Sequence, residues 1–170
     1  MNAEIPNEVW VLGKGPSLDR YDHSKRGYTI GINETAYLKN TDAAIAIDYP
    51  ILHKYLDNLK QDNILVLRKI THRTYIFKHM WLFEYNTHAP YVSYRTGTAS
   101  ILTQLLGYIG VKKIHYVGFD AIDGTGGYSG SILRNDAKGC NTDGYRLISA
   151  SVLGAISAFS IEAEWEHRKC

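Results

Sequence analysis

One segment, residues 9–18 with the sequence VWVLGKGPSL, constrains the fold of this chain more than any other. A short apolar run breaks there into Gly13 and Gly15, and Pro16 and Ser17 follow. A parallel strand that ends in closely spaced glycines brings backbone N–H groups to the carboxyl edge of a sheet, where glycine lets a phosphate approach the backbone closely. The segment therefore predicts a strand that leads into a nucleotide site.

The spacing of this segment differs from that of the two common phosphate loops. Lys14 lies between the glycines, and Leu18 stands where the third glycine of G-x-G-x-x-G would fall. The pattern G-x-x-x-x-G-K-[ST] does not fit either. A dehydrogenase or a P-loop ATPase is therefore disfavoured, and a tight turn without a ligand is the alternative interpretation of the segment taken alone.

A second motif, RTGTASILTQLLGYIGVKKIHYVGFD at 95–120, favours a ligand site. Thr96, Gly97 and Thr98 form a helix start, and the apolar positions after them recur at helical spacing. The remainder of the motif is typical of a strand that ends in Asp120. Ligands bind at such strand ends in open α/β sheets.

Strands and helices alternate along the chain. Strands are predicted at 9–12, 28–33, 43–48, 64–67, 112–119 and 160–165, and helices at 34–39, 50–59, 98–110 and 142–159. Residues 81–94 fit either a loop or an edge strand. Because parallel neighbours need crossover connections, the alternation predicts an α/β fold: a Rossmann-like, mostly parallel sheet with helices on both faces. The length favours a single domain, 1–170.

Polar side chains follow several of these strands. Asn33 ends the second predicted strand, Asp48 the third and Asp120 a late one. If these strands are parallel, the three side chains and the GKGPS loop lie around one crevice. Asn33 and Asp48 are equally suited to be N-caps of the helices that follow them.

The GKGPSL and TGTASILTQLLGYIGVKKIHYVGFD motifs, with GIN between them, resemble the layout of sialyltransferases of the bacterial lipooligosaccharide type and of the animal type. They are also similar to a related group with a Gly-x-Gly-Pro-Ser-Leu loop that includes archaeal hydroxymethylpterin pyrophosphokinases. The resemblance spans more than half of the chain and implies a glycosyltransferase-A-like variant of the fold. It also implies that Gly13, Gly15, Pro16, Ser17 and Asn33 bind the nucleotide, with Thr96, Gly97 and Thr98 nearby and either Tyr91 or Tyr94 near the leaving phosphate. Lys14 in the same loop and Asp120 at the end of the late strand complete the predicted binding residues.

The sialyltransferases use a histidine near the final helix as a general base toward the acceptor hydroxyl. The matching region here, 139–147, contains Asp143 but no histidine. A carboxylate can abstract the same proton, so Asp143 or Asp48 is the expected catalytic base.

The function that the resemblance implies is transfer of a sugar from a nucleotide-sugar donor to an acceptor hydroxyl. The acceptor classes left open are a glycan, a small metabolite and a hydroxylated nucleic-acid base. No cofactor is demanded, although Mg²⁺ between a phosphate and Asp48 or Asp120 stays open. The alternatives are a Mg²⁺-dependent pyrophosphokinase or nucleotidyltransferase acting on a small molecule, and a nucleotide-binding module without catalysis.

Composition limits the other classes of protein. A formal net charge of +2 is too small to indicate nucleic-acid binding by itself, although basic and aromatic residues are interleaved at 67–95. The two cysteines have no zinc-site spacing. The sequence has neither a secretory leader nor an apolar run of the ~18 residues that a membrane span needs. A cytoplasmic protein is therefore expected, and no oligomeric state is indicated.

Overall fold

The computed structural model describes residues 5–22, 24, 27–35, 41–46, 64–66, 80–82, 97–120 and 142–166. For 46, 64–66, 80–82 and 142–148 only the backbone is described. The predicted helix at 50–59 lies outside these residues, and of the predicted helix at 34–39 only Glu34 and Thr35 fall within them, both helical.

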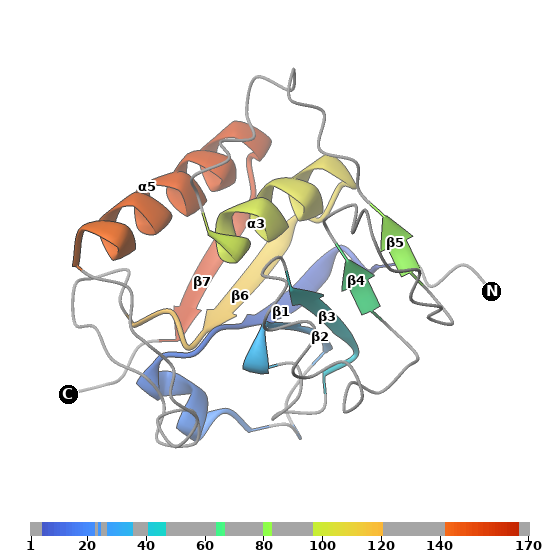
Figure 1. The fold of residues 1–170 in the computed structure, drawn as a ribbon. Helices are drawn as coiled ribbons and strands as arrows, with labels where there is room; N and C mark the ends of the chain where they lie inside the picture. The colour runs from blue at the N-terminus through green and yellow to red at the C-terminus, as the bar shows by residue number, and fades with distance from the viewer. Residues whose placement is uncertain are drawn as a thin grey trace, which may run out of the picture.

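All described strands belong to one parallel sheet (Figure 1). Every neighbouring pair is parallel, and the strand order is β5-β4-β3-β2-β1-β6-β7. The α/β fold predicted from the sequence is thereby confirmed. The strands are β1 (Glu8–Leu12), β2 (Tyr28–Ile32), β3 (Ala43–Ala46), β4 (Ile64–Val66), β5 (Met80–Leu82), β6 (Lys113–Val117) and β7 (Glu162–Glu166).

The strand order changes direction at β1. The chain moves outward from β1 through β2, β3 and β4 to β5, then returns to the other side of β1 to form β6 and β7. The loops that follow β1 and β6 therefore lead toward opposite halves of the sheet. In open α/β sheets such a topological switch point is where ligands bind.

Two α-helices, α3 (Thr98–Tyr108) and α5 (Thr142–Phe159), lie side by side on one face of the sheet (Figure 1). Every second residue of the central strands points toward these helices. The core between the sheet and the helices is apolar because the facing surfaces of both lose their contact with water. α3 presents a buried surface from Thr98 to Leu106. The residues that form this core on the central strands are Val9, Val11, Ile30, Ile32, Ile114 and Tyr116.

The opposite face carries a 3₁₀ helix, η1 (Pro16–Arg20), at the end of β1. Its buried Leu18 packs against Leu12 and Val117. Farther along this face His115 stacks on Trp10, with the ring centroids 4.0 Å apart. The sequence predicts helices on both faces of the sheet. In the described residues, the two α-helices lie on one face and the 3₁₀ helix η1 lies on the other.

Side-chain contacts tie β7, one of the two edge strands, to its neighbour β6. His115 lies between two carboxylates, with Nε2 2.6 Å from Glu8 and Nδ1 2.9 Å from Glu164. Lys113 pairs with Glu162 at 3.0 Å and with Glu164 at 2.6 Å. The hydrogen bond with Lys113 lowers the pKa of the Glu164 carboxyl.

Left-handed backbone conformations set three strand boundaries. β2 ends before Asn33 (φ 54°) and β6 before Gly118 (φ 76°), each earlier than predicted. Ser160 (φ 51°) ends α5, so β7 begins two residues after the predicted start at 160. The edge-strand interpretation of 81–94 is confirmed at its start, where β5 pairs with β4. No helix among the described residues is long and apolar enough to cross a membrane.

Tyr116 makes the unfolding free energy of this protein fall at alkaline pH. Burial raises the pKa of its phenol above the ordinary 10.0, and the hydrogen bond with Thr103 offsets part of the rise. The folded state therefore holds the phenolic proton more tightly than the unfolded state does. This contribution to stability is complete below about pH 10 and is lost as the pH rises further.

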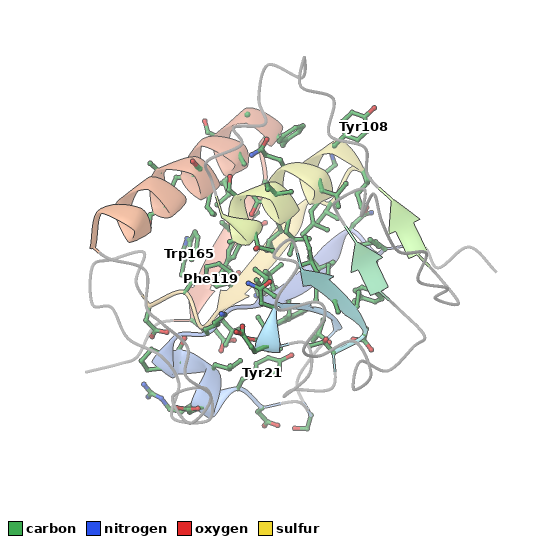
Figure 2. The ribbon with its side chains drawn as sticks, in the orientation of Figure 1. Tyr21, Tyr108, Phe119 and Trp165 are labelled. Atoms are coloured by element: carbon green, nitrogen blue, oxygen red, sulfur yellow. The ribbon has the colours of Figure 1, made fainter. Side chains whose placement is uncertain are left out.

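We expect Tyr116→Phe to flatten the fall of the unfolding free energy above about pH 10. The variant also loses the hydrogen bond to Thr103, which costs about 1 kcal/mol at neutral pH. Denaturant unfolding from about pH 8 to about pH 11 measures both effects. Tyr108, whose side chain is 82% exposed and points away from the core in Figure 2, supplies the control Tyr108→Phe. An unchanged slope in Tyr116→Phe would contradict the assignment.

Candidate functional site

The candidate site lies at the switch point between β1 and β6. Residues 13–17 follow β1 and residues 118–120 follow β6, so the two sequence motifs meet at the carboxyl edge of the sheet. This juxtaposition agrees with the prediction that the two motifs lie at one edge of a parallel sheet. It also brings together residues about a hundred positions apart in the chain.

Backbone hydrogen bonds join the two loops beyond the ends of their strands. The Gly13 N–H donates to the Val117 carbonyl at 2.7 Å, and the Gly15 N–H donates to the Gly118 carbonyl at 2.6 Å. On the other side, the Thr35 hydroxyl donates to the Gly13 carbonyl at 3.0 Å. The first loop is therefore held on both sides, by the end of β6 with its loop and by the turn that follows β2.

A buried hydroxyl and a buried carboxylate fasten the tips of the two loops. The Ser17 N–H and hydroxyl both donate to Asp120 Oδ2, at 3.0 and 2.8 Å. The same hydroxyl oxygen accepts the Gly118 N–H at 2.8 Å. We call Ser17, Gly118 and Asp120 the loop clamp. Asp120 thus lies at the site as predicted, and it acts there as an acceptor for the protein's own groups.

The two loop glycines allow this close approach. A Cβ on Gly13 would lie 2.6 Å from the Gly118 carbonyl oxygen and 2.9 Å from the Phe119 ring. A Cβ on Gly15 would meet Asp120 and would lie 2.8 Å from the same carbonyl oxygen. This differs from the expectation that these glycines make room for a phosphate, because the second loop occupies the space and takes up their amides.

The end of β2 contributes an amide side chain. The left-handed backbone of Asn33 differs from the extended conformation usual at an N-cap, and its N–H donates to the Ile45 carbonyl at 2.8 Å. Its Oδ1 is buried and accepts no hydrogen bond from the residues that the structure describes. The N-cap alternative for Asn33 is therefore wrong, because a capping oxygen would accept an amide of the following turn.

A charged pair lies beside this amide. Lys14, between the two glycines, places its ammonium 2.5 Å from Glu34 Oε2. The Glu34 side chain is 10% exposed and that of Lys14 22% exposed. Glu34 was not singled out from the sequence, because it lies in a stretch that reads as an ordinary helix start. Its position directly after Asn33 is the one signal that could have indicated it.

The helix start predicted at Thr98 is confirmed. Gly97 is the N-cap of α3, makes no side-chain capping bond, and is followed by a first turn without acidic residues. α3 runs back from the end at which β6 terminates toward the end at which β6 starts, so its first turn lies toward the carboxyl edge of the sheet (Figure 1). Such a turn is suited to an anion, since its first amides and the helix dipole favour negative charge.

Aromatic rings pack behind the second loop. Phe119 and Trp165 lie near each other beneath α5 in Figure 2, with their ring centroids 6.2 Å apart. Trp165 also stacks on Tyr116, 4.2 Å between centroids. These contacts support the loop at Gly118, because they hold the ring of the next residue, Phe119.

Several predicted residues lie outside what the structure describes. Asp48, Tyr94 and Thr96 belong to such segments, and Asp143 lies in α5 without a described side chain. Their predicted roles stay predictions. Within the described ranges, no group of three or more histidine, cysteine, aspartate or glutamate residues could hold a metal ion.

Comparisons with known proteins identify no relative of this chain. No model of a protein family matches the chain, and no curated protein matches it either.

The close contact at Gly15 predicts a steric cost for any side chain. Gly15 has φ −71°, which every residue adopts, so Gly15→Ala tests the contact with Asp120 and Gly118 rather than backbone strain. We expect a loss of about 1–3 kcal/mol in the unfolding free energy, measured by denaturant unfolding. Gly154→Ala on α5 is the control: a Cβ there meets nothing within 4 Å, and about 0.5–1 kcal/mol should be gained. Equal effects at both positions would contradict the packing argument.

The loop clamp predicts that Ser17→Ala destabilises the fold by about 1–3 kcal/mol. The variant leaves the buried Gly118 N–H without its acceptor and removes one donor from Asp120. Ser24→Ala removes a similar hydroxyl-to-carboxylate bond at an exposed position and should change stability by less than about 0.5 kcal/mol. Chemical denaturation of the two variants beside the wild type gives the comparison, and a Ser17→Ala protein as stable as Ser24→Ala would rule out a structural role for the clamp.

Proposed function

We propose that this protein binds a nucleotide at the switch point and transfers a sugar from a nucleotide-sugar donor to an acceptor hydroxyl. One observation carries the binding part of the proposal: Asn33 Oδ1 is buried at the end of β2, the neighbour of β1, and has no donor among the described residues. A buried acceptor without a partner costs about 1–3 kcal/mol, and a ligand that donates a hydrogen bond there would recover it.

The neighbouring groups support an anionic, hydrogen-bonding ligand. Lys14 supplies a cation at the same edge, and the first turn of α3 supplies uncapped amides. A nucleotide combines the required features, since its base and ribose carry donors and its phosphate carries the negative charge. The fixed loops favour such a ligand because groups that are already held lose little conformational entropy on binding.

The transfer step follows from the chemistry of a nucleotide-sugar. The bond between the anomeric carbon and the phosphate oxygen breaks, the nucleotide leaves with the electron pair, and the acceptor oxygen forms the new bond at that carbon. The acceptor proton passes to a carboxylate, for which Asp48 and Asp143 are the sequence-based candidates. Positive groups near the departing phosphate stabilise the charge that develops on it.

Binding without catalysis is the second candidate function. Among the carboxylates predicted for the site, Asp120 is the one with a described side chain, and its Oδ2 already accepts two hydrogen bonds from Ser17. This engagement favours a structural carboxylate over a general base at that position. If neither Asp48 nor Asp143 takes the acceptor proton, a protein with this arrangement holds a nucleotide without turning it over.

A thermal-shift screen tests the proposal. CMP, UMP, GMP and AMP are each added with and without Mg²⁺, because a ligand that binds only the folded state raises the melting temperature. We expect a shift with one nucleotide that does not require Mg²⁺, followed by release of that nucleotide from its sugar conjugate. A shift without turnover would indicate the binding module, and a strictly Mg²⁺-dependent shift with AMP would indicate phosphoryl chemistry. No shift at all would refute the nucleotide site.

Asn33→Gly removes the amide and keeps the backbone. Glycine adopts the left-handed conformation readily, and the variant also removes the acceptor without a partner, so the unfolding free energy should not fall by more than about 0.5 kcal/mol while nucleotide affinity falls about tenfold. Ser160→Gly is the matched control, because Ser160 is the other non-glycine residue with positive φ in the described ranges and lies at the end of α5. Calorimetric titration of both variants decides the matter: equal affinities for the nucleotide would exclude Asn33 from the site.

A further inference from the structure

The loop after β1 has few backbone donors left for a phosphate. The N–H groups of Gly13, Gly15 and Ser17 all donate to the β6 loop, and the Leu18 N–H donates to the Gly15 carbonyl at 3.0 Å. Pro16 has no N–H to offer. A glycine-rich loop that recognises a phosphate normally does so through these amides. Here the amides of Gly13, Gly15, Ser17 and Leu18 stabilise the fold instead, and the Lys14 N–H is the one amide of residues 13–18 without a described acceptor.

The remaining positive group of this loop is the Lys14 side chain. Its backbone is fixed on both sides, because the two flanking glycines are hydrogen-bonded to β6 and Gly13 also accepts from Thr35. The ammonium is therefore presented from a rigid base at the switch point. The ammonium forms an ion pair with Glu34 Oε2, and its three N–H donors make no hydrogen bond to that oxygen.

Glu34 is suited to hold this ammonium in position. Its side chain is 10% exposed, less than half the value for Lys14, so the carboxylate lies deeper and the lysine lies on the solvent side of the pair. An incoming anion would meet the ammonium first. A lysine in this arrangement can contact the carboxylate beneath it and a phosphate above it at the same time.

We infer that the Lys14 ammonium, held by Glu34, is the group that recognises the phosphate of the ligand, in place of the glycine-loop amides. The inference rests on the proposed nucleotide site and adds the residue that selects for phosphate. Glu34 is a positioning residue that acts through Lys14. It follows that the preference for a nucleotide over its nucleoside depends on one side chain, whereas the glycines are required for folding.

The test compares affinities for a nucleotide and for its nucleoside by calorimetric titration of the full chain. The probe is whichever of CMP, UMP, GMP and AMP binds the wild type, paired with the same base as a nucleoside. Lys14→Met alone would leave the Glu34 carboxylate buried without its partner, which endangers folding. The decisive comparison is therefore between Glu34→Gln and the double variant Lys14→Met/Glu34→Gln, which differ only in the lysine.

We expect Glu34→Gln to keep the preference for the nucleotide, because the variant retains the Lys14 ammonium on its fixed backbone. The double variant should lose about tenfold or more of its nucleotide affinity, with nucleoside affinity unchanged. Lys112→Met removes the same charge at an exposed position before β6, on the opposite edge of the sheet, and should change neither affinity.

Two other outcomes separate this inference from the proposed function. If the wild type binds a nucleotide and the double variant keeps the same preference over the nucleoside, Lys14 is not the phosphate-recognition residue, and the nucleotide site stands. A parallel loss for nucleotide and nucleoside also overturns the inference, since it indicates a general disturbance of the site. If the wild type binds none of the four nucleotides, the proposed function itself fails.

Discussion

The hydrogen bonds between the loops after β1 and β6 are the constraint on which the candidate site depends. They extend the pairing of two central strands beyond the point where the strands end, and they join motifs from the two halves of the chain. The loop clamp completes this junction with a buried hydroxyl and carboxylate. Because the junction lies at the switch point, the same contacts that hold the sheet together also fix the surface that a ligand would meet.

A second clamp of the same kind shows that this chemistry is structural. The Thr29 N–H and hydroxyl both donate to Asp42 Oδ2, at 2.8 and 2.7 Å, and the Asp42 N–H donates back to the hydroxyl at 3.1 Å. Asp42 precedes β3, so this clamp lies at the amino edge of the sheet, and the Ser17 clamp lies at the carboxyl edge. A carboxylate at a strand end can thus serve the fold alone, and position at the carboxyl edge does not by itself make Asp120 catalytic.

Much of the fold follows from local patterns in the sequence. The predicted helix at 142–159 agrees with α5, and the start of α3 at Thr98 agrees as well, because helical periodicity and a glycine at the N-cap are local signals. What could not be predicted depends on distant partners. Nothing near Gly13 or Gly15 reveals that their amides pair with Val117 and Gly118, about a hundred residues away. The left-handed turn at Asn33 was likewise not visible, since an asparagine after a strand also fits an N-cap.

The charge pattern of the edge strand β7 limits how a further strand can pair with this sheet. Its glutamates at 162, 164 and 166 alternate with Ala163 and Trp165, so one face of the strand carries a row of like charges. A strand at the edge of a sheet invites pairing with a copy of itself. In-register pairing of two β7 strands would bring glutamate against glutamate whether the strands run parallel or antiparallel. The ion pairs with Lys113 neutralise part of this charge within one molecule, whereas a second β7 strand would bring no positive charge of its own. The edge strand β7 therefore opposes extension of the sheet into an aggregate.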